Sequence, residues 1–346
     1  MPAFHDDVVA EVLSSRPGLT RVLLGSGVRA YALTESIGPV AAGDAVVVNT
    51  TAVELGLGTG GWHVVHWNLS RGAWREPGPG HLMKLRYTSL QADTGAVEET
   101  HPDLPSQLDD TPVVVGGLHS QLPVVVATIA ALRPGTRVAY VMTDGGALPI
   151  AMSDVVAALR DRGALVGTVT AGHAFGGDLE ALNVPSALTA ARHLLDAEVV
   201  VVAMGPGVAG TASRLGYTAL EVAPALDAVA WLGGRPIACL RCSSGDGRER
   251  HRGVSHHSLT ALDAVRSEVD VPLPPALDRS LVPAHRHRWP IVDPGPVARH
   301  LAALDLQITT MGRGIDEDPL FFAAAAAAGA FAASAVGPAN RPAGRP

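Results

Sequence analysis

The sequence is poor in several residue types, and each shortage narrows the function classes. Aromatic residues make up 4% of the 346 residues. Charged residues make up 17%, whereas their usual share is about a quarter. Two cysteines exclude a disulfide framework and suit a reducing compartment, so we expect a cytoplasmic protein. The formal net charge of −7 argues against nucleic-acid binding, which requires basic surfaces and stacking rings.

Long, strongly apolar runs are also scarce. The longest, Leu320 to Val336, is mostly alanine and is shorter than the ~20 apolar residues of a membrane-spanning helix. The N-terminus carries Asp6 and Asp7 and no basic segment before an apolar stretch, which argues against a secretory signal. We therefore expect no membrane attachment.

Glycine and proline, in contrast, are abundant. The 38 glycines and 26 prolines sum to 64 residues, close to a fifth of the chain, against a usual share of about 12%. Because no repeat accompanies them, they indicate many turns and loops. With 47% apolar residues, the chain can also bury a large core, and its length predicts about two domains.

Residues 1–75 have the pattern of a small β-barrel-like domain. Short segments rich in Val, Leu, Thr, Tyr and Trp are separated by turn residues and predict strands. These segments are Leu19–Leu24, Gly27–Leu33, Asp44–Asn49 and Trp62–Asn68. A barrel is expected because closure removes exposed sheet edges. Residues 76–110 are expected to form a connector.

From residue 111 the pattern changes to alternating buried strands and helices. The predicted strands are Val113–Val115, Val138–Met142, Val166–Val169, Val199–Met204 and Pro236–Leu240. The predicted helices that follow them are Gln121–Leu132, Met152–Arg162, Ser186–Leu195, Thr211–Leu232 and Ser258–Ser267. Uniformly apolar strands in such an order predict an α/β fold, a doubly wound, Rossmann-like parallel sheet over residues 111–336. A final helix capped by Asp318 and a disordered tail at 337–346 complete the expectation.

The loops after the five strands carry glycine beside polar or ionisable side chains. Because these loops share the carboxyl edge of a parallel sheet, where ligands of such folds bind, we expect the site there. The loops of the opposite edge are short, and we expect no such cluster there.

Four runs resemble a known family. They are Gly80–Tyr87, Gly117–Gln121, Thr143–Pro149 and Arg248–His257. They are similar to an uncharacterised bacterial family, domain-of-unknown-function family 3866, over residues 1 to about 330. The resemblance implies no activity, so function must be argued from the residues.

Two segments predict an anion site. Gly205, Gly207 and Gly210 match G-x-G-x-x-G before the helix expected from Thr211, where backbone amides and the helix dipole favour phosphate. These three glycines and Thr211 are candidate anion-binding residues. The alternative is a packing turn, and Pro206 argues against dinucleotide binding. The second segment contributes candidate anion ligands, which are Arg248, Arg250, Arg252 and Ser255. Its alternative is a solvated basic loop.

Lys84 is the single lysine of the chain and a further candidate anion ligand. It lies in the predicted connector, which could cover the site as a lid. The alternative is an ordinary surface lysine.

Histidines and carboxylates of the same loops predict catalysis. The candidate catalytic residues are His119, Asp144, His173 and His256. The candidate ligands of a divalent metal (Zn, Mn or Fe) are His173, Asp178, His251 and His257. The alternatives are capping and loop-bracing roles. Cys239 and Cys242 are interpreted as buried strand cysteines.

These observations favour an enzyme acting on a small anionic, phosphate-bearing substrate, with hydrolysis as its chemistry and metal assistance as an option. The alternative is a non-catalytic nucleotide- or phosphate-sensing module. The expected partner is a small anionic molecule, and association with a second copy of the chain is left open.

Overall fold

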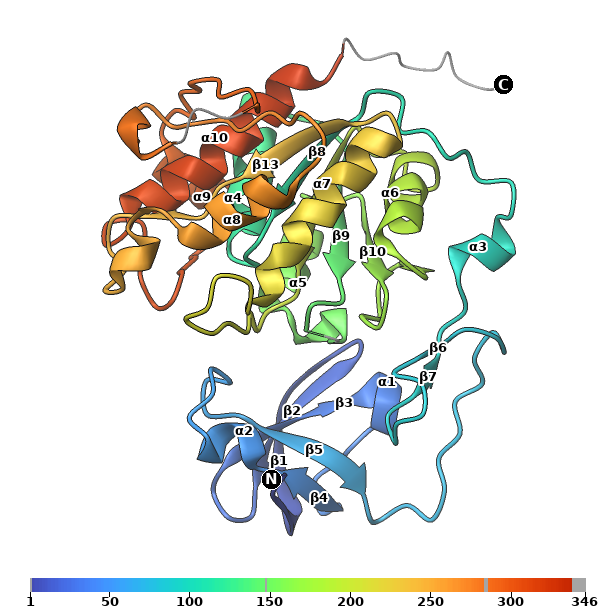
Figure 1. Ribbon diagram of the computed structural model, residues 1–346. Coiled ribbons are helices and arrows are strands. Elements are labelled where there is room, and N and C mark those ends of the chain that lie inside the picture. Colours follow the sequence, from blue (N-terminus) through green and yellow to red (C-terminus); the bar gives the residue numbers. More distant parts are fainter. Residues whose placement is uncertain (1, 147, 283–285, 338–346) are drawn as a thin grey trace. The chain divides into compact units, whose positions relative to one another are not determined.

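The computed structural model describes residues 2–146, 148–282 and 286–337, and the chain divides into two compact units (Figure 1). The barrel unit comprises the residues up to Ala96 together with Pro149–Met152. The α/β unit comprises Val97–Leu148 and the chain from Ser153 onward. The segment expected as a connector, 76–110, is thus shared between the two units.

The barrel unit contains a closed five-stranded barrel in the order β1-β2-β3-β5-β4, which confirms the predicted barrel. Its strands are β1 (Phe4–Arg16), β2 (Leu19–Leu24), β3 (Arg29–Leu33), β4 (Ala45–Asn49) and β5 (His63–Asn68). β1 was not predicted. Most of its side chains are exposed, so its sequence lacks the alternation of a half-buried strand.

Short elements complete the barrel unit. They are the helices α1 (Thr34–Ile37) and α2 (Thr51–Glu54) and a two-stranded ribbon of β6 (Met83–Lys84) and β7 (Ala92–Asp93). Lys84 is only 1% exposed in this ribbon, so the interpretation as an ordinary surface lysine is wrong.

The α/β unit is built on a six-stranded, entirely parallel sheet in the order β11-β10-β9-β12-β8-β13. The strands are β8 (Pro112–Gly116), β9 (Val138–Thr143), β10 (Gly167–Ala171), β11 (Leu179–Ala181), β12 (Val199–Met204) and β13 (Arg235–Cys239). Strands β8, β9, β10 and β12 are buried along their whole length, as their continuous apolar runs predicted. The short edge strand β11 was not predicted.

The helices of the α/β unit are α3 (Val97–Thr100), α4 (Gln121–Leu132), α5 (Asp154–Asp161), α6 (Val184–His193), α7 (Val222–Trp231), α8 (His256–Ala264), α9 (Val297–Ala303) and α10 (Pro319–Ala335). Of these, α4, α6, α7 and α10 pack against strands of the sheet (Figure 1). The alanine run of α10 packs against α4. A Cβ at Gly329 would lie 2.7 Å from the carbonyl oxygen of Val125, so only glycine allows this approach.

The strand order reverses between the neighbouring strands β9 and β12. The chain leaves β9 through α5 toward β10 on one side, and it leaves β12 through α7 toward β13 on the other. Such a reversal is the switch point at which α/β sheets bind ligands, outside the carboxyl ends of the strands. A ligand site is therefore expected next to Thr143 and Met204, where these two strands end.

Two expectations at helix ends are wrong. The helix predicted from Thr211 begins only at Val222, after a 3₁₀ turn at Thr218–Glu221, because Gly216 and a loop that folds on itself interrupt the pattern. Asp318 occupies the N-cap position of α10, but its side chain makes no cap hydrogen bond.

Two further expectations concern the C-terminal region and the membrane. Of the expected disordered tail, residues 338–346 lie outside the described residues. Among the residues that the structure describes, no helix has the length and apolar character required to span a membrane.

Candidate functional site

Three histidines of the segment after β13 lie together. We call His251, His256 and His257 the histidine cluster. A two-stranded ribbon of β14 (Cys242–Ser243) and β15 (Gly253–Val254) holds the 3₁₀ turn that ends at His251. His256 and His257 are the first residues of α8. The buried Ser255 side chain caps α8 by accepting from His257 N at 3.2 Å, and it lies 2.7 Å from Nδ1 of His251.

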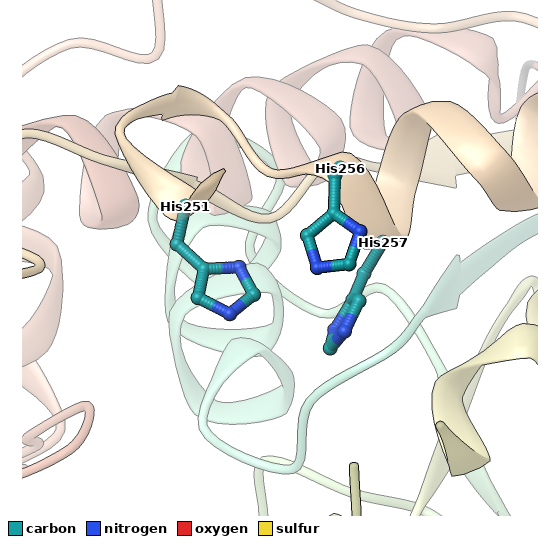
Figure 2. A group of neighbouring side chains, drawn as sticks. All are labelled: His251, His256 and His257. Atoms are coloured by element: carbon teal, nitrogen blue, oxygen red, sulfur yellow. The ribbon is translucent and has the colours of Figure 1, made fainter. Parts of the chain in front are cut away.

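The rings of the cluster face one another (Figure 2). The ring centroids of His256 and His257 are 4.3 Å apart. The ring centroid of His251 lies 5.1 Å from that of His256 and 4.8 Å from that of His257. One ligand atom from each residue can be chosen so that all lie within 4.8 Å of one another. Tyr217 stacks on His257 at 3.8 Å and holds its ring in place. The sequence did not identify Tyr217 as part of this site.

The cluster contains imidazole nitrogens without partners. The Nε2 atoms of His256 and His257 are buried and have no hydrogen-bond partner. Burial, followed by the charges of Arg241 and Arg248, lowers the pKa of His251 to about 3. Burial and the neighbouring His256 lower the pKa of His257 to about 4, and burial with Arg250 lowers that of His256. The three rings are therefore neutral near pH 7.

An arginine network surrounds Asp246 beside the cluster. Arg248 binds both carboxylate oxygens of Asp246, at 2.9 and 2.8 Å, and holds the pKa of that carboxyl well below its usual range. Arg241 Nη2 lies 3.4 Å and Arg313 Nη2 3.7 Å from the same carboxylate. The predicted anion ligand Arg248 is thus already paired, whereas Arg250 is exposed.

Asp318 holds the loop that carries this network. Its fully buried carboxylate accepts hydrogen bonds from Ser243 Oγ at 2.6 Å, Ser244 N at 2.8 Å and Arg313 Nε at 3.1 Å. The start of α10 is thereby joined to the loop after β14. This role replaces the helix cap that the sequence predicted for Asp318.

A second group of polar side chains lies at the switch point. We call His119, Tyr140, Thr143, Asp144, Ser153 and Glu221 the switch-point cluster. His119 Nε2 lies 2.6 Å from Ser153 Oγ, and its Nδ1 lies 3.3 Å from the carbonyl oxygen of Met204. Because a carbonyl only accepts, Nδ1 carries the proton and Nε2 accepts from the serine hydroxyl. Burial lowers the pKa of His119 to about 4.

Glu221 is the carboxylic acid of this cluster. Thr143 Oγ1 donates a short hydrogen bond to its carboxyl group. Burial and the charge of Asp144 raise the pKa of Glu221 to about 7, against the opposing effect of the Thr143 hydrogen bond. Asp144 is exposed, and its carboxylate accepts from His173 N at 3.2 Å. Glu221 was missed because it lies in a stretch that the sequence pattern assigned to the interior of one long helix.

One short segment joins the two clusters. Tyr217 stacks on His257, and four residues later Glu221 binds Thr143 at the end of β9. Between them, Ala219 lines a cavity of about 20 Å³ together with Gly117 and His257, which is enough for one water molecule.

The predicted glycine loop reaches the same edge without forming a helix N-terminus. Gly205 and Gly207 follow β12, and a Cβ at Gly210 would lie 3.6 Å from Cε1 of His257. Thr211 Oγ1 accepts from Ser213 N at 3.2 Å and closes a local turn. Since α7 begins only at Val222, the helix expected from Thr211 does not follow the loop directly, and anion binding by the loop stays a prediction without the helix dipole.

Several other predicted residues do not join the clusters. The Asp178 carboxylate accepts hydrogen bonds from Arg160 at 2.5 Å and from Thr168 N and Oγ1 at 2.8 Å, and it does not join a group of potential metal ligands among the described residues. Among the described residues, the histidine cluster is the only group of three potential ligands, and it excludes His173. Arg252 Nε donates to the backbone oxygen of Asp246 at 3.0 Å. Lys84 belongs to the barrel unit.

The two cysteines are buried and free, as predicted. Burial raises the pKa of the Cys239 thiol to about 12, so the thiol is not reactive near neutral pH.

The amino edge of the sheet holds a wider cavity, which contradicts the expectation that its loops carry no charged cluster. It measures about 630 Å³. The charged residues that line it are Asp109, Asp110, Arg133, Arg137, Arg192, Asp196 and Glu198. These charges pair largely with one another, through ion pairs of Arg137 with Asp196 and of Arg192 with Asp109 and Asp196.

Comparison with known proteins identifies one family. Residues 29–329 match the family model described as a protein of unknown function (DUF3866). No curated protein and no solved structure matches the chain.

Proposed function

We propose that this chain, which belongs to the DUF3866 family of proteins of unknown function, is a hydrolase of a small phosphate-bearing substrate. The observation that carries the proposal is the segment Tyr217–Glu221, which joins the histidine cluster to the carboxyl group of the switch-point cluster. In this proposal the histidine cluster and Arg250 hold the anionic group, and the switch-point cluster cleaves the bond.

The strand ends beside the two clusters are close enough for a small substrate to span them. The loop after β8, with Gly117, lines the cavity beside His257, whereas Glu221 binds the end of β9. One strand, β12, separates β8 from β9. Strand spacing of about 4.8 Å therefore separates the two ends by about 10 Å, the length of a small phosphorylated molecule.

Glu221 and Asp144 supply the proton transfers. Two neighbouring carboxyl groups with different environments divide into an acid and a base. Asp144 takes a proton from the attacking water, whose oxygen bonds to the electrophilic atom of the substrate. Glu221 gives its proton to the leaving atom as the scissile bond breaks. One proton passing from Asp144 back to Glu221 restores the resting state.

We further propose that the α/β unit is Rossmann-like. Without β8, the order β11-β10-β9-β12-β13 follows the order 3-2-1-4-5 of that fold. β8 is inserted between β12 and β13, and no helix connects β10 to β11. Both departures leave the switch point between β9 and β12 in place.

Mass-spectrometric detection of products from a panel of nucleotides, sugar phosphates and other phosphate-bearing esters, amides and glycosides tests the proposed function. We expect hydrolysis of at least one class, and a loss of about 10²- to 10⁴-fold in Glu221→Gln, as for removal of a general acid. Glu268→Gln, an exposed carboxylate paired with Arg288, is the matched control and should retain activity. Thermal stabilisation by these ligands without turnover of any would overturn the proposal and favour a sensing module.

A further inference from the structure

We propose that His251, His256 and His257 bind one divalent transition-metal ion of the zinc class, which anchors the anionic group of the substrate. The anchoring role rests on the proposed function. The presence of the metal does not, because it is measured on the protein without substrate.

The positions of the donor atoms suit such an ion. A tetrahedral zinc with Zn–N bonds of 2.0–2.1 Å holds its ligand nitrogens about 3.3 Å apart. One nitrogen from each histidine can be chosen so that the three already lie within 4.8 Å of one another, so each pair must close by at most about 1.5 Å. Rotation of the imidazole rings at the start of α8 supplies a movement of this size.

The unpartnered nitrogens form an independent observation. The Nε2 atoms of His256 and His257 are buried without a hydrogen-bond partner. Buried polar atoms nearly always have one, so an exception requires an explanation. A bound metal ion satisfies both atoms at once.

A hydrogen-bond partner that can orient the ring of His251 is already in place. The Nδ1 atom of His251 lies 2.7 Å from Ser255 Oγ. When Nδ1–H donates to this hydroxyl, the Nε2 lone pair of His251 is free to bind a metal, as in many metal sites.

Arg241 requires one rearrangement. Its Nη1 lies 3.5 Å from Nδ1 of His257, at the limit of a hydrogen bond. Metal binding at Nε2 transfers the proton of His257 to Nδ1, where it faces the guanidinium group. Arg241 can then turn toward Asp246, whose Oδ2 already lies 3.4 Å from its Nη2.

The surrounding charge indicates what accompanies the metal. Arg241, Arg248 and Arg313 are opposed by two carboxylates, Asp246 and Asp318, and Arg250 adds a further positive charge. A cation enters such surroundings most favourably together with an anion. Three histidines leave a fourth coordination position for that anion. Metal and phosphate should therefore increase each other's affinity, by the reciprocity of linked binding.

The donor set selects the class of ion. Imidazole nitrogen suits zinc and its neighbours in the first transition row, whereas magnesium and calcium require oxygen ligands. The three donors are all imidazoles. We therefore expect Zn²⁺ or Co²⁺ to bind and Mg²⁺ to fail.

Isothermal titration of the full chain with Zn²⁺, after removal of metal with a chelator, tests the inference. We expect one equivalent to bind, and Co²⁺ to give the strong visible absorption of a tetrahedral site. His256→Ala and His257→Ala should weaken binding by at least about 100-fold. His173→Ala, a half-buried loop histidine outside the cluster, is the matched control and should bind normally.

His256→Gln tests the same ligand with an uncharged side chain of similar length, in case His256→Ala does not fold. Inorganic phosphate at saturating concentration should raise Zn²⁺ affinity in the wild-type chain.

Three outcomes overturn the inference. They are no stoichiometric binding, equal binding in the wild type and the folded cluster variants, and phosphate binding that is equally tight without metal. Stoichiometric metal without turnover of any substrate would instead leave the metal site in place and refute only the proposed function.

Discussion

The two edges of the parallel sheet hold their charges in different ways. At the amino edge, a cavity of about 630 Å³ is lined by arginines and carboxylates that pair with one another. At the carboxyl edge, the cavity beside His257 measures about 20 Å³, yet two buried imidazole nitrogens of the histidine cluster have no partner. Cavity size and number of charges by themselves would therefore favour the amino edge as a binding site.

The carboxyl edge differs in having buried polar groups that lack a partner or have a shifted pKa. A paired charge has already gained its stabilisation and offers little to a ligand. A buried nitrogen without a partner, or a carboxyl group whose pKa is raised to about 7 by burial, has free energy to gain from a ligand. The predictions below test this difference, from the largest expected effect to the smallest.

Asp318→Ala should destabilise the α/β unit most, because it removes the fixed anion that holds the carboxyl-edge loop. Ser243, Ser244 and Arg313 would lose their shared acceptor. Loss of one partner of a buried ion pair costs about 3–5 kcal/mol, which urea denaturation measures. Glu268→Ala, which breaks an exposed pair, is the control. Equal costs for the two variants would refute the structural role of Asp318.

Glu221→Gln should flatten the pH dependence of stability. Because the folded-state pKa of Glu221, about 7, lies above its ordinary value of 4.5, the folded state favours the protonated carboxyl. This contribution is complete below pH 4.5 and is lost as pH rises to about 7. Relative to the variant, the wild type should lose about 1–2 kcal/mol over this range once solvent screening is considered.

Denaturation midpoints at pH 4.5, 6 and 8 provide the measurement. Thr143, Asp144 and Tyr140 surround the carboxyl group of Glu221. They are the same in both proteins, so the difference between the two curves reports on Glu221. Parallel curves for the two proteins would show that Glu221 does not titrate in this range.

Arg137→Ala should have the smallest effect. This amino-edge arginine is 46% exposed and pairs with Asp196 at 3.4 Å, so its removal should cost less than about 1 kcal/mol. Metal content and hydrolysis should be unchanged, since neither proposal uses the amino edge. A loss of either would show that the wide cavity takes part in function.

Much of the α/β unit could be predicted from the sequence. The Val-rich runs of β8, β9 and β12 are uninterrupted, and this pattern is typical of strands buried on both faces. β1 and β11 lacked a pattern, since the first is largely exposed and the second is three residues long. The helix start at Val222 depends on the folded loop before it, which periodicity does not describe.

The candidate site was predicted by region rather than by residue. The segment Arg248–His257 was identified from its density of arginine and histidine, and the structure places the histidine cluster there. Glu221 and Tyr217 carried no signal, because an isolated acid and an isolated aromatic in an apolar stretch have no pattern. Asp178 was selected for its position in a loop, but Arg160 and Thr168 occupy its carboxylate.

The sequence by itself therefore determined the classes of element and the parallel sheet, because both depend on local hydrophobic pattern. Only the tertiary structure decided which polar side chains meet and which remain without partners. Pairing depends on distances between segments remote in the chain, such as Asp318 with Ser243 or Glu221 with Thr143.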